Sequence, residues 1–481
     1  MVSASGSVEG LPLGVQTLDV PSGGPGLDAL AAAVDVTRHP LLLAGGAESS
    51  SLGQWRMLAF DPVELIEHRV GGAREQEPAR RGIPRLMHAM GRAFGAPDPA
   101  RAAAQRDDPR LPPFRGGAMG LLGFDLGREL ERLPDRLPRD TDLPDLFMGL
   151  YPFVLAEHVA SGRRVISGRG TDAQAAAFRR AVEALADRAR DPKEILPGQA
   201  GAPTSTFERE AYEQAVARVV EHIRAGDIYQ VNLSQRFELG YSGTPAALHH
   251  ALCARSPTPF GSVLRTPAWS LVSNSPELFL RRRGARIESR PIKGTRPRGC
   301  DQPTDDRLRH ELETSAKEHA ELAMIVDLVR NDLSRPAVLG SIDVDLPFET
   351  EAWATVFHRV ATVHGRLPED VDVAKVVEAA FPPASVTGTP KIRALEIVEA
   401  LEPVRRHAYT GALGWFDADG DFDLSVNIRI ATQVGERLLL PVGGGITVRS
   451  EPAAEYVETW HKARAMFEAL RAPLPPGCFD P

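Results

Sequence analysis

The chain has 481 residues, of which 43% are hydrophobic and 25% are charged, and its formal net charge is −8. This length suits one large domain or two to three ordinary ones, and the composition is that of a globular protein with a sizeable core. The acidic balance argues against a nucleic-acid-binding protein, which needs a basic face. No apolar run approaches the roughly 20 residues of a membrane helix. No basic segment followed by an apolar stretch opens the chain, so we expect a cytoplasmic protein without signal peptide or membrane contact.

The three cysteines, Cys253, Cys300 and Cys478, share no close spacing. This argues against a disulfide framework and against a zinc knuckle, and favours incidental thiols in a reducing compartment.

Residues 1–189 form a predicted N-terminal region in which short apolar runs alternate with Gly and Pro turns. Residues 172–189 are rich in alanine and arginine, which predicts a helix. Residues 190–204 are rich in proline and glycine, which indicates a linker. The predicted buried strands of this region are 41–43, 119–122 and 153–155.

Residues 205–470 form the second predicted region, and 471–481 form a C-terminal tail. Ser205-Thr206-Phe207-Glu208 matches a capping box, in which a hydroxyl and a carboxylate satisfy free amides at a helix start. Apolar residues then recur at helical spacing as far as Ile223, with Gly226 as the stop. The other predicted elements are helices over 318–333 and 451–470 and strands over 229–233, 261–264, 271–273, 278–280, 412–416, 425–431 and 438–441. Because strands and helices alternate irregularly, the pattern predicts an α+β or mixed α/β sandwich, not a barrel or a doubly wound sheet.

Two pairs of glutamates share the faces of two predicted helices. Glu318 and Glu321 lie three residues apart, as do Glu455 and Glu458, so each pair points to one side of its helix. Brought together, the pairs would offer hard oxygen ligands suited to Mg²⁺, which takes only one or two protein carboxylates and keeps several waters. The alternative is two solvated helix faces.

Two glycine-containing segments favour an anionic ligand. Gly443-Gly444-Gly445 precedes the last helix, and three glycines allow a backbone to approach a ligand closely; the alternative is a tight turn. Lys462 lies one turn beyond Glu458 and either reaches a bound anion or pairs with that glutamate. The loop Thr387-Gly388-Thr389-Pro390-Lys391 comes before a predicted helix that ends at residue 401, and a helix N-terminus suits a carboxylate; a plain loop is the alternative.

Lys293 is a candidate nucleophile, because it lies in a short segment between a proline and a glycine. Burial and neighbouring cations would strip its proton at neutral pH, whereas a surface lysine keeps it. Glu277 is a candidate proton donor if burial raises its pKa, and otherwise a surface acid. Arg429, grouped with Tyr409, lies in a strand pattern and either binds a substrate carboxylate or faces outward.

These segments together resemble the chorismate-utilising enzymes and, within them, the component I subunits of aminodeoxychorismate synthase. The similarity covers nearly the whole chain and is strongest from residue 207 onward, where the family's motifs follow in order. The matching segments are residues 226–234, Ser275-Pro276-Glu277, Pro291-Ile292-Lys293-Gly294-Thr295, residues 315–318 and 327–333, Gly388-Thr389-Pro390-Lys391 and Gly443-Gly444-Gly445-Ile446, with weaker matches at 114–117 and 123–126. The resemblance implies a sandwich of two antiparallel-rich sheets with outer helices, like anthranilate synthase component I.

Two positions separate the reactions of this family. Anthranilate synthases carry alanine where this chain has Lys293, and aminodeoxychorismate synthases carry lysine. Isochorismate and salicylate synthases carry a general-base lysine in the segment where this chain has Gln230. The chain departs from the family at Leu322, where histidine or asparagine usually follows the glutamate that matches Glu321.

The resemblance implies a role for each candidate residue. Lys293 would attack carbon 2 of chorismate and Glu277 would protonate the hydroxyl that leaves carbon 4, after which ammonia adds there and expels the lysine. Mg²⁺ would be held by Glu321 and Glu458, with Glu318 and Glu455 completing the site through water. The residues implied to bind the two substrate carboxylates are Thr387, Gly388, Tyr409, Arg429, Gly444, Gly445 and Lys462.

The resemblance also implies a partner. The chain carries no glutaminase pattern, so we expect ammonia from a separate glutamine amidotransferase subunit. The family's tryptophan site usually carries Leu-Leu-Glu-Ser, whereas this chain has Leu42-Leu43-Ala44-Gly45, so we expect no inhibition by tryptophan. A tryptophan pocket with a purely structural role is the alternative. The alternatives are anthranilate synthase component I and an inactive protein that binds chorismate or tryptophan as a regulator; the four glutamates argue against the latter.

Overall fold

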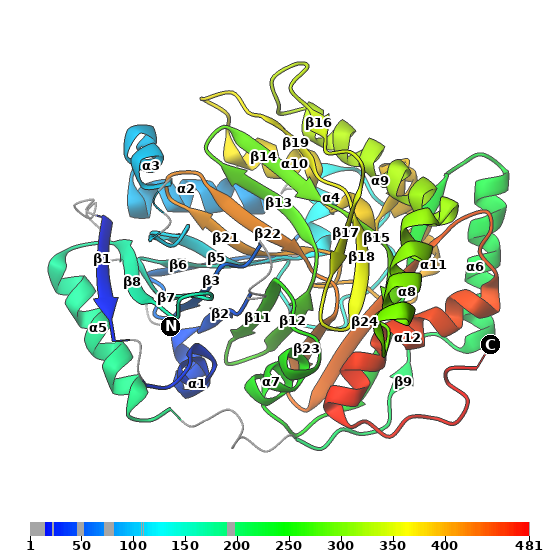
Figure 1. Cartoon of the computed structure of the whole chain (residues 1–481), viewed down its shortest axis with the longest axis horizontal. Coiled ribbons are helices and arrows are strands. Elements are labelled where there is room, and N and C mark those ends of the chain that lie inside the picture. The colour runs from blue at the N-terminus through cyan, green and yellow to red at the C-terminus, as the bar shows by residue number, and fades with distance from the viewer. Residues whose placement is uncertain are drawn as a thin grey trace.

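The computed structural model describes residues 15–21, 24–45, 52–71, 81–106, 108, 110–189 and 198–480. Within these residues, two large antiparallel sheets and one small sheet form the body of the molecule, and helices lie along the outside (Figure 1). The predicted α+β sandwich is therefore confirmed. In the described part, no helix is long and apolar enough to cross a membrane.

The larger sheet has twelve strands and draws on both predicted regions. β2 pairs with β3 on one side and with β11 on the other, which joins the N-terminal strands to the C-terminal ones. In spatial order the strands are β1 (Val15–Val20), β8 (Arg164–Arg169), β7 (Phe153–His158), β3 (Trp55–Ala59), β2 (Leu41–Leu43), β11 (Phe260–Arg265), β12 (Ser270–Ser275), β23 (Ile430–Val434), β24 (Arg437–Ile446), β10 (Gln230–Gly240) and β20 (Gly388–Thr389), with β9 (Thr204–Ser205) paired to β10.

The second sheet has nine strands, and a third sheet of three strands lies beside it. The nine are β16 (Asp343–Val344), β19 (Val363–Arg366), β14 (Arg286–Arg290), β13 (Leu278–Arg283), β22 (Phe422–Val426), β21 (Ala412–Asp417), β5 (Gly117–Leu122), β6 (Leu146–Tyr151) and β4 (Glu64–His68). The three are β15 (Ile292–Pro297), β18 (Val356–Val360) and β17 (Glu349–Ala352). The sequence did not predict the small sheet, which carries Lys293.

Hydrophobic cores explain why many strands are apolar along their whole length. One core lies between the two large sheets and includes Phe147, Tyr151 and Trp415. Another lies where α2 and α9 cover the second sheet. β5, β6 and β21 are therefore buried on both faces, which removes the alternation of a half-exposed strand.

The described residues form twelve helices, of which the sequence predicted only the five over 172–186, 209–224, 316–334, 391–401 and 452–470. The twelve are α1 (Leu27–Ala33), α2 (Gly82–Phe94), α3 (Pro99–Arg106), α4 (Gly127–Leu130), α5 (Asp172–Ala186), α6 (Arg209–Arg224), α7 (Pro245–Arg255), α8 (Gln302–Thr314), α9 (Ala316–Ser334), α10 (Val373–Ala380), α11 (Lys391–Leu401) and α12 (Pro452–Leu470). Short 3₁₀ turns cover Val36–Arg38, Phe124–Leu126 and Ala384–Val386.

The capping box expected at the start of α6 was wrong. Glu208 is the N-cap and its side chain makes no capping bond. The two hydroxyls bond to the neighbouring strand β10 instead: Ser205 Oγ donates to Gln235 Oε1, and Thr206 Oγ1 accepts from the Arg236 amide at 3.0 Å. Ser205 Oγ also accepts from the local Phe207 amide at 3.0 Å.

The single strand expected over 425–431 was also wrong. β22 belongs to the second sheet and β23 to the first, so the chain crosses between the sheets after residue 426. Arg429 lies in this crossing with a left-handed φ of 52°. Its carbonyl accepts from the Asn274 amide at 3.0 Å, which fixes the crossing against β12.

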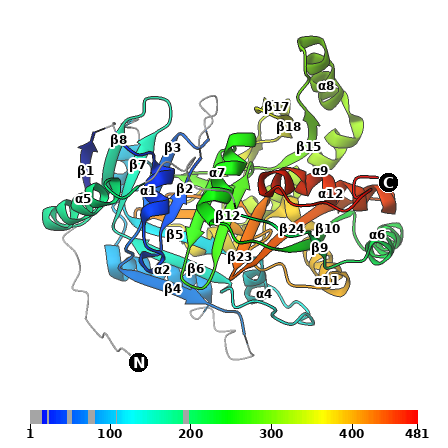
Figure 2. The ribbon, with the colours of Figure 1, turned by 90° about the horizontal axis from the view of Figure 1, so that it is seen from below.

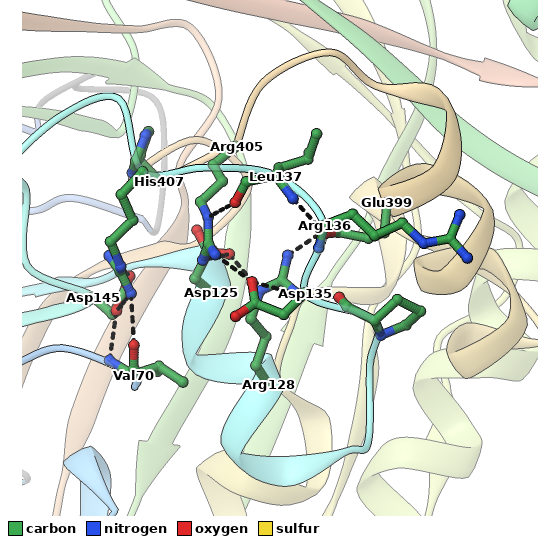
Figure 3. Close-up of polar contacts among 12 residues, drawn as sticks. Val70, Asp125, Arg128, Asp135, Arg136, Leu137, Asp145, Glu399, Arg405 and His407 are labelled. Atoms are coloured by element: carbon green, nitrogen blue, oxygen red, sulfur yellow. Dashed lines mark hydrogen bonds and ion pairs between the residues drawn. The ribbon is translucent and has the colours of Figure 1, made fainter. Parts of the chain in front are cut away.

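A buried polar network holds the turn between α11 and β21 in place (Figure 3). Arg405 Nε donates to the Leu137 carbonyl at 2.7 Å. Arg128 Nε donates to Asp125 Oδ1 at 2.7 Å, and its NH2 donates to Glu399 on α11 at 2.5 Å. These bonds connect the segment after α4 both to α11 and to the turn that leads into β21.

Candidate active site

Strand β10 brings three of the predicted segments side by side. In the β10–β24 ladder, Asn232 is the partner of Gly445. On the other edge of β10, Val231 is the partner of Gly388. The Asn232 amide donates to the Thr387 carbonyl at 2.7 Å. The glycine run and the Thr387 loop therefore flank one strand end.

Gly445 faces the candidate nucleophile. A Cβ built on Gly445 would lie 3.4 Å from Lys293 Nζ and 2.5 Å from Gln230 Nε2. A side chain at this position would therefore displace Gln230 and fill the space in front of the lysine, which gives a physical reason for glycine here.

Gly444 faces the side chains of α12. A Cβ on Gly444 would lie 3.3 Å from Glu455 Oε2, 3.5 Å from Lys462 Nζ and 3.7 Å from Glu458 Oε1. Figures 1 and 2 show α9, α12 and β15 gathered around this part of β24. The sequence-predicted carboxylates of α12 thus meet the glycine run directly.

Lys293 is half-buried, and its Nζ donates to the Ser385 carbonyl at 3.2 Å. Burial is the main cause that lowers its pKa, and the cation of Lys462 lowers it further, while nearby carboxylates oppose the shift. The surroundings therefore favour the uncharged amine that a nucleophile needs.

Glu277 is buried, with 4% of its surface exposed. Burial raises its pKa to about 7, although a hydrogen bond with Ser385 and the charges of Lys293 and Arg429 act in the opposite direction. A carboxylic acid that keeps its proton near neutral pH, beside an amine whose pKa is lowered, is the pairing that an acid and a nucleophile require.

The glutamates of α9 and α12 influence one another's protonation. Burial raises the pKa of Glu321, and the charges of Glu318 and Glu458 raise it further. Burial, reinforced by Glu458, likewise raises the pKa of Glu455. Lys462 instead lowers the pKa of Glu458, because its Nζ lies 2.7 Å from Glu458 Oε1. The intrahelical ion pair considered from the sequence is therefore present, and it lies inside the site.

Glu318 lies on the β15 side of this group. Its Oε1 accepts from Arg296 NH1 at 3.3 Å, and a Cβ on Gly294 would lie 3.0 Å from its Oε2. Among the described residues, no three His, Cys, Asp or Glu side chains form a ready-made metal group. One carboxylate from each helix, completed by water and substrate oxygens, still fits the needs of Mg²⁺, and the charge of Glu458 acts on both Glu321 and Glu455, which places the carboxylates of the two helices near one another.

Two of the predicted carboxylate-binding residues, Tyr409 and Thr387, contact Asn232 at the same strand end, whereas Arg429 lies on the side of Glu277. Tyr409 is 4% exposed, and burial raises its pKa to about 12 although it hydrogen-bonds with Asn232. Thr387 is 1% exposed, and its Oγ1 donates to the Pro383 carbonyl at 3.1 Å. Arg429 is half-buried, and burial lowers its pKa while Glu277 raises it.

Sequence reasoning missed His358 altogether, and it placed Ser385 ahead of the Thr387 loop without predicting its contact with Lys293. Ser385 accepts from the Lys293 amine, and His358 on β18 is buried at 2% exposure with its Nδ1 3.0 Å from Thr295 Oγ1. Burial and the charge of Arg429 lower the pKa of His358 to about 3. His358 lies in the strand pattern of β18 without a sequence signal of its own.

Leu322 does not leave a polar gap in the site. It is fully buried in the core beneath α9, together with Ile325 and Val326. An apolar residue therefore suits this position.

A separate cavity of about 540 Å³ lies away from this centre. Leu43, Gly45, Phe260 and Trp415 are among its lining residues. A Cβ on Gly45 would lie 2.1 Å from the Pro259 carbonyl oxygen, so the backbone packs too closely there for a side chain. The broken motif at residues 42–45 therefore borders a real cavity.

Comparisons with known proteins agree with this geometry. The chain is 38% identical to aminodeoxychorismate synthase component 1 of Escherichia coli over 74% of this chain and 78% of that protein. It is 39% identical to anthranilate synthase component 1 of Thermus thermophilus over 78% of this chain and 82% of that one. The crystal structure of anthranilate synthase component I from Streptococcus pneumoniae superposes with a TM-score of 0.72 at 26% identity, covering 88% of this chain and 93% of that one. Residues 49–468 match the model of the chorismate binding enzymes, and the chain therefore belongs to that family.

Proposed function

We propose that this protein is component I of an aminodeoxychorismate synthase, which converts chorismate and ammonia to 4-amino-4-deoxychorismate and water. The observation that carries the proposal is Lys293: an amine with a lowered pKa, opposite Gly445, with the proton-holding Glu277 nearby. The product would supply 4-aminobenzoate and folate synthesis.

The proposed reaction runs in two displacements. The Lys293 amine forms a bond to carbon 2 of the ring, the double bonds shift, and the carbon 4 hydroxyl takes the Glu277 proton and leaves as water. Ammonia then bonds to carbon 4, the double bonds shift back, and the carbon 2–nitrogen bond to Lys293 breaks. The covalent intermediate divides one difficult displacement into two easier ones.

Glu321 and Glu458 are the proposed Mg²⁺ ligands, with Glu318 and Glu455 acting through water. When bound, the ion neutralises and orients the ring carboxylate. Lys462 would contact the same carboxylate, because it already lies between Glu458 and the Gly443 carbonyl at 2.7 and 2.8 Å. The amides near Gly388, Gly444 and Gly445, with Thr387, Tyr409 and Arg429, would hold the second one.

We also propose that ammonia comes from a separate glutamine amidotransferase subunit. The support is indirect: the relatives of Escherichia coli and Thermus thermophilus are both named as component 1 of their synthases. Free ammonium at high concentration should replace the partner in an assay.

Anthranilate synthase component I is the second candidate, because a relative with that name shares 39% identity. The test is product analysis by mass spectrometry after incubation with chorismate, Mg²⁺ and an ammonium salt. We expect aminodeoxychorismate, and at least a 100-fold loss of its formation in Lys293→Ala, since the substitution removes the proposed nucleophile. Lys375→Ala, an exposed lysine of α10, is the control and should keep full activity. Fluorescent anthranilate from the unaltered protein, or full activity in Lys293→Ala, would refute the proposal.

A further inference from the structure

A thiol, an imidazole and a carboxylate lie in a row outside the active site. His249 and Cys253 are four residues apart on α7 and therefore share a face. Cys253 Sγ lies 3.3 Å from His249 Nε2, and His249 Nδ1 lies 3.4 Å from Asp28 Oδ1 on α1. Figures 1 and 2 show α1 beside α7.

The surrounding charges hold this row in place. His249 is 2% exposed, so its ring orientation is fixed by packing as well as by Asp28. Asp28 forms an ion pair with Arg56 on β3, and Arg56 NH1 lies 3.3 Å from Glu157 on β7. Arg265 on β11 lines the same small cavity as Asp28 and His249, but its NH1 donates to backbone carbonyls at the end of α1.

The surroundings of His249 favour its protonated form. Burial disfavours a charged His249, but the negative charge of Cys253 and the hydrogen bond with Asp28 outweigh it and raise the pKa of His249 to about 10. An imidazolium, with Arg56 close by, is the environment in which a thiolate is stabilised.

We propose that Cys253 is an activated thiolate and a site of reversible oxidation by hydroperoxides. The sulfur bonds to one oxygen of hydrogen peroxide, the O–O bond breaks, and the second oxygen leaves as hydroxide, which takes up a proton to form water. The sulfur is oxidised by two electrons to sulfenic acid while the peroxide is reduced, and thiols reverse the change. His249 stabilises the thiolate, and Asp28 orients His249.

The position of the thiol suits a small oxidant. Cys253 is half-buried. A Cβ on Gly261 would lie 3.8 Å from its Sγ, and Gly261 also lines the cavity of about 540 Å³, so the thiol lies close to that cavity wall. Oxidation there would place a polar oxygen where α7 packs on β11.

The chain contains its own comparison. Cys478 is half-buried like Cys253, but burial raises its pKa. Limiting iodoacetamide on the full chain, followed by peptide mass spectrometry, gives the alkylation rate of each cysteine in one sample. Between pH 8.5 and 6.5 we expect the rate of Cys253 to fall less than threefold and that of Cys478 to fall about 100-fold, as for any thiol with a pKa above this range.

Two variants assign the effect to the row. His249→Gln should lower the alkylation rate of Cys253 at pH 6.5 at least tenfold, and Asp28→Asn should lower it by a smaller factor. Neither variant should change the alkylation rate of Cys478. Hydrogen peroxide followed by dimedone should label Cys253 ahead of Cys478 as a sulfenic acid. The proposal is overturned if Cys253 and Cys478 share one pH profile, if neither variant changes the rate, or if Cys253 reacts only under denaturing conditions. None of these results depends on the activity towards chorismate.

Discussion

Substitution of Glu277 by glutamine should stabilise the folded protein while removing its activity. The unfolded chain ionises this carboxyl near the ordinary value of 4.5, whereas the folded protein holds the proton up to about pH 7. Folding therefore binds a proton in this window, so the free energy of unfolding falls as pH rises through it and stays low above it. Glutamine keeps the shape of the side chain but has no charge to bury.

The size of the effect follows from the two pKa values. From 4.5 to about 7, at about 1.4 kcal/mol per pH unit, ionised Glu277 costs the folded state about 3 kcal/mol above pH 7. At pH 5 only the first part of the window has been crossed, and the cost is about 1 kcal/mol. Glu277→Gln should therefore exceed the unaltered protein in stability by about 1 kcal/mol at pH 5 and by about 3 kcal/mol at pH 8.

Urea unfolding followed by far-ultraviolet circular dichroism at both pH values measures this difference. Glu436→Gln, which removes an exposed carboxyl, is the matched control and should change stability equally little at both. A gain from Glu277→Gln that does not depend on pH, or a loss of stability at pH 8, would refute the reasoning that Glu277 is a proton-holding acid.

Two further predictions concern the space around the lysine. Gly445→Ala adds a methyl group 2.5 Å from Gln230 Nε2 and 3.4 Å from Lys293 Nζ. The value of kcat/KM for chorismate should therefore fall at least tenfold, while the circular dichroism spectrum stays unchanged. Gly240→Ala is the control, because its methyl group would meet no atom within 4 Å, and it should leave kcat/KM unchanged. Lys462→Met removes a cation that lowers the pKa of Lys293, so the pKa of Lys293 should rise. The acidic limb of the pH profile of kcat/KM should then move to higher pH. If the limb does not move, it does not report the titration of Lys293.

The sequence predicted the helices and strands whose local apolar pattern is clear, and it missed others, among them α2, α7, α8 and α10. α9 and α12 were recognised as helices, and their glutamates do share one region: Glu455 and Glu458 lie beside Gly444, and the charge of Glu458 acts on Glu321. The crossing at Arg429 was not predictable from the pattern. Flanking isoleucines continue the alternation of a strand, while the left-handed backbone is set by the need to pass between two sheets.

Contacts between distant segments were equally beyond the sequence. β15 contains Lys293 but shows no alternation of apolar and polar residues. It is held as a strand by its pairing with β18, which the sequence does not reveal. The spacing of His249 and Cys253 is visible in the chain, but the carboxylate that completes their row comes from Asp28, in a distant segment near the N-terminus. Long-range partners of this kind follow from topology and not from local propensity.

The interleaving of the sheets limits how this enzyme can be divided or recombined. Residues 205–470 contain the glutamates and the lysine, yet on their own they would leave β11 and β21 as long open edges where β2 and β5 now pair. Such edges invite intermolecular pairing. The half that carries the candidate site is therefore not an independent folding unit: we expect a fusion or chimera that lacks the N-terminal strands to aggregate.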